Sequence, residues 1–179
     1  MLKKRPIIGV VGSHSEAWED FSRPLGKFLA ESGVHLLTGG GAGVMSEVAK
    51  AFTDVQDREG LCIGVLPMTD PTEHHGLKKM FPNPYIEIPV FTLLDQESRS
   101  DVMPFSLNHT NVMTPHAIIV LPGFHGTMNE VSMAIAYEKP FVLYGPEDAF
   151  KAFPENAAFA ETLETVEHFL SGIFVKGKK

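Results

Sequence analysis

Residues 34–52 read VHLLTGGGAGVMSEVAKAF, and this stretch decides the fold. The apolar run Val34–Leu37 predicts a buried strand, and the glycine-rich residues 39–43 predict a tight turn directly after it. Apolar side chains then recur at helical spacing on one face, at Val44, Met45, Val48, Ala49 and Phe52. A strand, a glycine turn and a helix in this order form the repeating unit of an α/β protein with a parallel sheet.

The same unit recurs on both sides of this stretch. Upstream, Ile7–Val11 predicts a strand closed by Gly12-Ser13, and apolar residues at 25–29 predict a helix that stops at Gly33. Downstream we expect strands at 61–66, 86–91, 117–121 and 141–144, helices at 106–113, 127–137 and 157–170, and a long surface loop at 68–84. Because parallel strands need crossover helices, these elements predict a doubly wound α/β fold, with helices on both faces of one parallel sheet.

The composition limits the class of protein. No shift in composition marks an internal boundary, so we expect one domain over residues 1–179, with its core at about 5–145 and a closing helix at about 157–170. The formal net charge is −7 and the basic residues are scattered between the termini, so we expect no nucleic acid partner. Cys62 is the only cysteine, which excludes an internal disulfide and fits a reducing, cytoplasmic compartment. We expect neither secretion nor a membrane partner, because no signal-peptide pattern and no apolar run near the roughly 18 residues of a membrane span are present.

Three glycine-containing turns follow predicted strands, at Gly12-Ser13, at residues 39–43 and at residues 123–127. In an open parallel sheet, ligands bind beyond the carboxyl ends of the strands, so all three turns can face one crevice. Glycines let backbone N–H groups approach an oxyanion, and the following helix directs its positive end to the same point, which predicts a phosphate site. The alternative is that each turn needs a glycine only for its backbone dihedrals. Neither the dinucleotide pattern GxGxxG nor the P-loop pattern is present.

The last of these turns is followed by a carboxylate. If the helix starts at Thr127, Glu130 lies about one turn into it and can reach back to the helix mouth. One interpretation is a capping box, in which both side chains satisfy backbone N–H groups, and the other is a catalytic carboxylate. The adjacent pair His74-His75 lacks a third ligand at suitable spacing, so we predict no metal ion, and we predict no cofactor either.

Two of the turns together resemble the LOG family, a group that includes plant cytokinin-activating phosphoribohydrolases, bacterial proteins once called lysine decarboxylases, and a molybdenum cofactor carrier. The sequence TGGGAGVM at 38–45 matches the family's glycine-rich turn. The sequence LPGFHGTMNE at 121–130 matches its PGGxGTxxE signature except at Phe124, where the family has glycine. Leu107 is a second departure, because the family has an arginine at this position. The resemblance covers roughly residues 5–145.

The resemblance implies a Rossmann-like fold, usually a homodimer, that binds a nucleoside 5′-monophosphate between the two glycine-rich turns. It also implies hydrolysis of the bond between base and ribose, with Glu130 as the catalytic carboxylate that stabilises an oxocarbenium-like ribose. The residues expected to contact the nucleotide or its phosphate are Gly12, Ser13, Gly39, Gly40, Gly41, Gly43, Met45, Asn108, Gly123, His125, Gly126 and Thr127.

Two functions remain open at this point. The first is a phosphoribohydrolase that releases free base and ribose 5-phosphate, which Glu130 favours. The second is a carrier that binds a nucleotide or phosphorylated cofactor without cleaving it. Leu107 favours the carrier, because leucine cannot supply the charge and planar hydrogen bonds of an arginine. Phe124 favours it as well, because the bulky ring that stands where the family has glycine either fills space meant for the ribose or base, or stacks on a base. Both functions require a phosphorylated, nucleotide-like small molecule as partner.

Overall fold

The structure, a computed structural model, describes residues 4–67, 82–92 and 107–176 of the chain. Within these residues the strands are β1 (Ile7–Val11), β2 (His35–Thr38), β3 (Cys62–Pro67), β4 (Ile88–Thr92), β5 (Ala117–Val120), β6 (Phe141–Tyr144) and β7 (Phe159–Ala160). The helices are α1 (Glu19–Glu31), α2 (Val44–Thr53), α3 (Leu107–Met113), α4 (His125–Ala136) and α5 (Leu163–Lys176), together with a 3-10 helix, η1 (Glu147–Phe150).

These strands form one sheet in the order β4-β3-β2-β1-β5-β6-β7, and every neighbouring pair is parallel. The predicted α/β fold class is therefore confirmed. From β1 the chain builds outward through β2 and β3 to β4, and it then returns to the opposite side of β1 with β5. The strand order thus reverses between β1 and β5, which is where open parallel sheets form a crevice for ligands.

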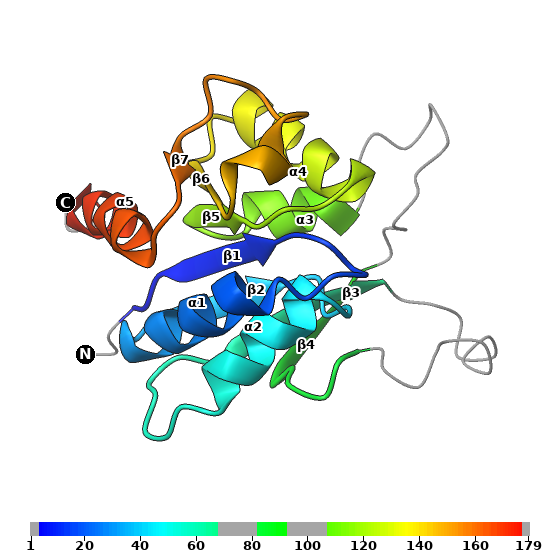
Figure 1. The fold of residues 1–179 in the computed structure, drawn as a ribbon. Coiled ribbons are helices and arrows are strands. Elements are labelled where there is room, and N and C mark those ends of the chain that lie inside the picture. The colour runs from blue at the N-terminus through cyan, green and yellow to red at the C-terminus, as the bar shows by residue number, and fades with distance from the viewer. Residues whose placement is uncertain (1–3, 68–81, 93–106, 177–179) are drawn as a thin grey trace.

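Helices cover both faces of the sheet (Figure 1). On one face lie α1, α2 and α5, whose side chains Leu29, Phe52 and Leu170 belong to the largest buried cluster. On the other face lie α3, α4 and η1, and Val112 and Val131 contribute to a second cluster there. Since both faces of the sheet are buried, its central strands are the continuous apolar runs on which the prediction of strands relied.

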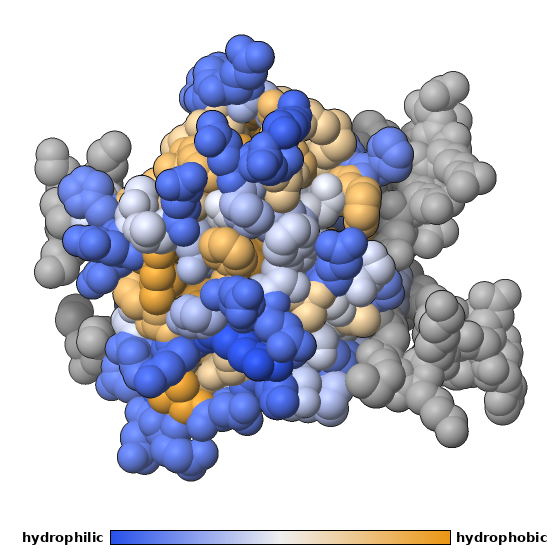
Figure 2. Space-filling view, in the orientation of Figure 1, coloured by the Kyte–Doolittle hydropathy of each residue, from blue (hydrophilic) through white to orange (hydrophobic). Residues whose placement is uncertain are grey.

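Figure 2 shows the molecule from the side of α1 and α2, where hydrophilic side chains prevail and smaller hydrophobic areas lie between them. Arg23 on α1 forms ion pairs on this surface with Glu19 and with Glu47 of α2. Among the helices that the structure describes, none has both the length and the apolar composition needed to cross a membrane.

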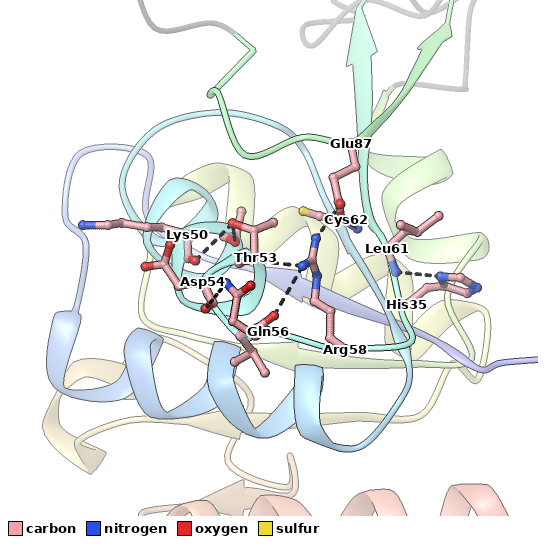
Figure 3. A network of polar contacts seen from close by, with 11 residues as sticks. His35, Lys50, Thr53, Asp54, Gln56, Arg58, Leu61, Cys62 and Glu87 are labelled. Carbon is pink, nitrogen blue, oxygen red and sulfur yellow. Dashed lines mark hydrogen bonds and ion pairs between the residues drawn. The ribbon is translucent and has the colours of Figure 1, made fainter.

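A polar network joins the end of α2 to the starts of β3 and β4 (Figure 3). The Arg58 guanidinium donates to the Thr53 and Val55 carbonyls at the end of α2, at 3.2 and 3.4 Å, and it pairs with Glu87. Glu87 in turn accepts a hydrogen bond from the Cys62 N–H at 2.8 Å. Burial raises the pKa of the Cys62 thiol to about 12, so this cysteine packs as an unreactive apolar side chain.

The closing part of the chain differs from expectation. The predicted helix over 157–170 begins only at Leu163, because residues 159–160 form β7 on the edge of β6, where the Leu143 N–H donates to the Ala158 carbonyl at 2.9 Å. The open edge of β6 offers backbone hydrogen bonds that outweigh the helix propensity of the alanines. Helix α1 also begins before its predicted apolar run, at Glu19, and it accommodates Pro24.

Candidate functional site

The three glycine-containing turns meet at the carboxyl ends of β1, β2 and β5. Val11 pairs with Val120, so β1 and β5 end level and their following turns start side by side. The Ser13 N–H donates to the Pro122 carbonyl at 3.0 Å, and the Ser13 carbonyl accepts from the Val44 N–H at 2.9 Å. The main chain of Ser13 therefore joins the turn after β1 to the turn after β5 and to the start of α2.

A cavity of about 520 Å³ opens at this junction. Most of the residues predicted to contact a ligand line it, namely Gly12, Ser13, Gly39, Gly41, Met45, Asn108, His125, Gly126, Thr127 and Glu130. The sequence prediction that these turns face one crevice thus agrees with the geometry.

Three other predicted contact residues, Gly40, Gly43 and Gly123, lie outside the lining and shape the turns instead. Gly43 has φ +62°, and a Cβ on it would lie 2.3 Å from the Ser13 carbonyl oxygen. A Cβ on Gly123 would lie 2.1 Å from the Thr127 hydroxyl oxygen and 2.9 Å from the Ser13 nitrogen. Close approach of the three turns therefore requires glycine at both positions.

Helix α4 starts at His125, two residues before the predicted start, so Thr127 is its third residue. No side chain caps the helix, which means that the capping-box interpretation of Thr127 and Glu130 is wrong. Gly126 in the first turn lines the cavity, and a Cβ on it would meet nothing within 4 Å. The first N–H groups of a helix have no partner within the helix, so this end of α4 offers donors and a positive dipole end to the cavity.

Glu130 projects from α4 into the deepest part of the site, where it is only 8% exposed. The Asn111 side-chain amide of α3 donates a long hydrogen bond of 3.4 Å to its carboxylate. Burial raises the pKa of Glu130 to about 8, and the hydrogen bond from Asn111 acts in the opposite direction. Glu130 is therefore mostly neutral at pH 7 and presents a proton donor rather than a charge.

Asn111 is itself 4% exposed, and among the residues that the structure describes its amide oxygen has no hydrogen-bond partner. An unpaired buried acceptor is unfavourable by about 1–3 kcal/mol, so it marks a place where another donor is expected. The helix predicted over 106–113 includes Asn111, but the family resemblance implies Asn108 as the contact. The pairing of α3 with α4 that brings Asn111 to Glu130 is a tertiary contact, which no local pattern could indicate.

The lining that the structure describes contains no lysine or arginine. Leu107, at the position of the family's arginine, lines the cavity but is 1% exposed and packs with Leu37 and Val65. The ionisable side chains in the described lining are His14, His125 and Glu130. An anion in this cavity would be held by backbone N–H groups, hydroxyls and imidazoles.

Asn83 supports the glycine-rich turn after β2 through two hydrogen bonds, a role that the sequence does not indicate. Its amide donates to the Gly41 carbonyl at 2.9 Å, and its N–H donates to the Gly40 carbonyl at 2.9 Å. The position between Pro82 and Pro84 was assigned to a surface loop, yet Asn83 is 1% exposed. Buried asparagines commonly brace turns, but only the packing distinguishes such a residue from an exposed one.

Within the described residues, no group of three His, Cys, Asp or Glu side chains is arranged to hold a metal ion. His74 and His75 lie outside the described part of the chain, as do residues 68–81 of the loop predicted over 68–84.

The comparisons with known proteins agree with this geometry. A model of the SLOG cluster4 family matches residues 5–169. The molybdenum cofactor carrier protein of Chlamydomonas reinhardtii is 27% identical, with a TM-score of 0.70 over 96% of this chain and 99% of that chain. The molybdenum cofactor binding protein of the phototrophic bacterium Rippkaea orientalis is 25% identical, with a TM-score of 0.70 over 97% and 99% of the two chains.

A third solved structure, the structural-genomics target TM1055, is 20% identical and has a TM-score of 0.72 over 94% of this chain and 99% of that chain. At this identity the likeness concerns the fold alone. No curated protein matches the chain. The resemblance predicted from the two glycine-rich motifs is confirmed, and the chain belongs to the SLOG cluster4 family.

Proposed function

We propose that this chain binds a phosphorylated, nucleotide-like molecule or cofactor in the cavity between β1 and β5 and carries it without cleaving it. The observation that carries the proposal is the start of α4, which no side chain caps and whose first residues His125, Gly126 and Thr127 line the cavity. The unpaired Asn111 amide oxygen beside the cavity is a second sign that the site is incomplete without a ligand.

Charge favours carrying over cleavage. Departure of a base from a ribose leaves a positive charge on the sugar, which a carboxylate stabilises only when it is ionised. Burial raises the pKa of Glu130 and so favours its neutral form, and Leu107 supplies no guanidinium for the departing base. The similar structures from Chlamydomonas reinhardtii and Rippkaea orientalis, whose names describe carriage or binding of the molybdenum cofactor, support the same choice.

The binding test uses a carboxylate placed in the proposed phosphate position. Gly126→Asp puts a negative charge at the start of α4, where it stabilises the helix and repels or replaces a phosphate. Gly172→Asp is the matched control, because Gly172 on α5 also has open space and lies away from the cavity.

We expect AMP and ribose 5-phosphate to raise the Tm of the wild type and of Gly172→Asp, and to leave the Tm of Gly126→Asp unchanged. Equal increases in Tm for all three proteins would mean that the phosphate binds away from the start of α4. No shift of the wild type with either compound at millimolar concentration would overturn the proposal.

Hydrolysis remains the second candidate, because Glu130 occupies the position of the family's catalytic carboxylate inside the cavity. The test is release of free base from nucleoside monophosphates by wild type, Glu130→Gln and Leu107→Arg. We expect no release by the wild type. Release that disappears in Glu130→Gln and increases in Leu107→Arg would establish the hydrolase instead.

We further propose that the protein forms a homodimer through the ends of α3 and α4. Three apolar side chains there are each 46–47% exposed, namely Met113, Ile135 and Tyr137. The ring centroids of His109 and Tyr137 lie 6.0 Å apart, which joins the two helices. Exposed apolar side chains at the ends of two packed helices are one kind of surface that meets a second copy.

A further inference from the structure

Phe124 occupies an unusual place for a large apolar side chain. It immediately precedes α4, at φ −107° and ψ −149°, and because its φ is negative the backbone does not require the glycine that the family has there. Its side chain is 62% exposed and lines the cavity. It takes no part in the buried apolar clusters of the described residues, so the fold does not explain its presence.

The ring stands next to the proposed phosphate position. Gly126, with its open space, is two residues further along the same turn, and the His125 imidazole lies between them in the sequence. Across the junction at Ser13, the His14 imidazole lies over the turn after β2, where a Cβ on Gly41 would be 2.9 Å from its Nδ1. The cavity therefore has anion donors within and planar rings around its mouth.

Aromatic faces stack on planar heterocycles, and they do so with little regard to which heterocycle is present. A cavity with phosphate donors inside and an exposed phenyl ring at the mouth suits a ligand that has a phosphate at one end and a planar ring system at the other. A phosphorylated sugar without such a ring would leave Phe124 in water.

We infer that Phe124 is a specificity-determining residue, a stacking platform that selects phosphorylated ligands with a planar heteroaromatic ring over phosphorylated sugars. The inference rests on the proposed function, because it assumes that the phosphate binds at the start of α4. It contradicts the alternative in which Phe124 closes the site by filling the space left by a glycine.

The experiment compares AMP with ribose 5-phosphate by isothermal titration calorimetry in wild type, Phe124→Leu, Phe124→Gly and Phe91→Leu. Leucine keeps an apolar side chain but removes the aromatic face. Phe91→Leu is the matched control, since Phe91 on β4 is 60% exposed and lies outside the cavity lining.

We expect the wild type and Phe91→Leu to bind AMP at least about tenfold more tightly than ribose 5-phosphate. In Phe124→Leu and Phe124→Gly this preference should fall by about fivefold or more, with the affinity for ribose 5-phosphate unchanged. The emission of a Phe124→Trp variant, after subtraction of the Trp18 signal seen in the wild type, should be quenched by AMP and not by ribose 5-phosphate.

Two results would overturn the inference while the proposed function stands: an equal preference for AMP in wild type and Phe124→Leu, or tighter binding of AMP by Phe124→Gly. Binding of neither compound to the wild type would instead remove the proposed function and the platform together.

Discussion

Among the carboxyl groups that the structure describes, Glu130 has the environment least like that of an ordinary one, because it is buried and has the Asn111 amide as its hydrogen-bond partner. Its pKa in the folded protein is about 8, against an ordinary value of 4.5. Between these two pH values the folded chain holds a proton that the unfolded chain has released. The contribution of Glu130 to stability is therefore full below about pH 4.5, falls as the pH rises, and is lost above about pH 8.

This difference predicts that Glu130→Gln unfolds at nearly the same urea concentration as the wild type at pH 4.5. At pH 8.5 the variant should be more stable, by an amount on the order of a few kcal/mol, because glutamine stays neutral. Urea denaturation of both proteins at several pH values measures this. Glu155→Gln, which changes an exposed carboxylate, serves as the control and should follow the wild type at every pH.

At the scale of elements, the start of α2 depends on a glycine. Gly43→Ala forces a Cβ onto a residue with φ +62° and into contact with the Ser13 carbonyl oxygen, so we expect it to lower the free energy of unfolding by more than about 2 kcal/mol. Gly172→Ala, in the interior of α5 with open space around it, should instead raise it by about 0.5–1 kcal/mol. Thermal or urea unfolding of both variants tests the contrast, and equal effects would contradict it.

The other end of α2 depends on Arg58. Its guanidinium binds the carbonyl of the last α2 residue, Thr53, the Val55 carbonyl just after the helix and the Glu87 carboxylate, and its side chain is only 17% exposed. Lysine cannot reproduce this planar set of donors, so Arg58→Lys should lower the stability by roughly 1–3 kcal/mol. The exposed Arg23 also has two acidic partners, but Arg23→Lys should change the stability by less than about 1 kcal/mol. The midpoints of urea unfolding compare the two.

The elements also show what the sequence could and could not predict. The apolar runs at β1 and β5 and the glycines that follow β2 revealed the strands, the turns and the crevice, because both signals are local. β7 has two residues and exists only because β6 offers a free edge, so no periodicity marked it. The roles of Asn83 and Asn111 depend on segments that are distant in the sequence, and they became visible only in the packing.

At the scale of the whole molecule, the proposed homodimer can be tested by light scattering. We expect the mass of two chains for the wild type at micromolar concentration and the mass of one chain for Tyr137→Glu, because a carboxylate at the centre of an apolar contact is strongly unfavourable. Phe91→Glu, at an exposed site on the edge strand β4, should remain dimeric. If Phe91→Glu dissociates the dimer and Tyr137→Glu does not, the contact between the two copies lies at the sheet edge instead.

The junction of the three turns at the Ser13 main chain has a consequence for engineering. It is made by one N–H and one carbonyl of the main chain, so it does not depend on which side chains surround the cavity. Lining residues such as Asn108, Phe124 and Asn129 can therefore be randomised together while the three turns keep their arrangement. The fold is accordingly a suitable scaffold for libraries of artificial receptors. Every member of such a library would keep the anion-binding turns, and selection would concern only the side chains that contact the rest of the ligand.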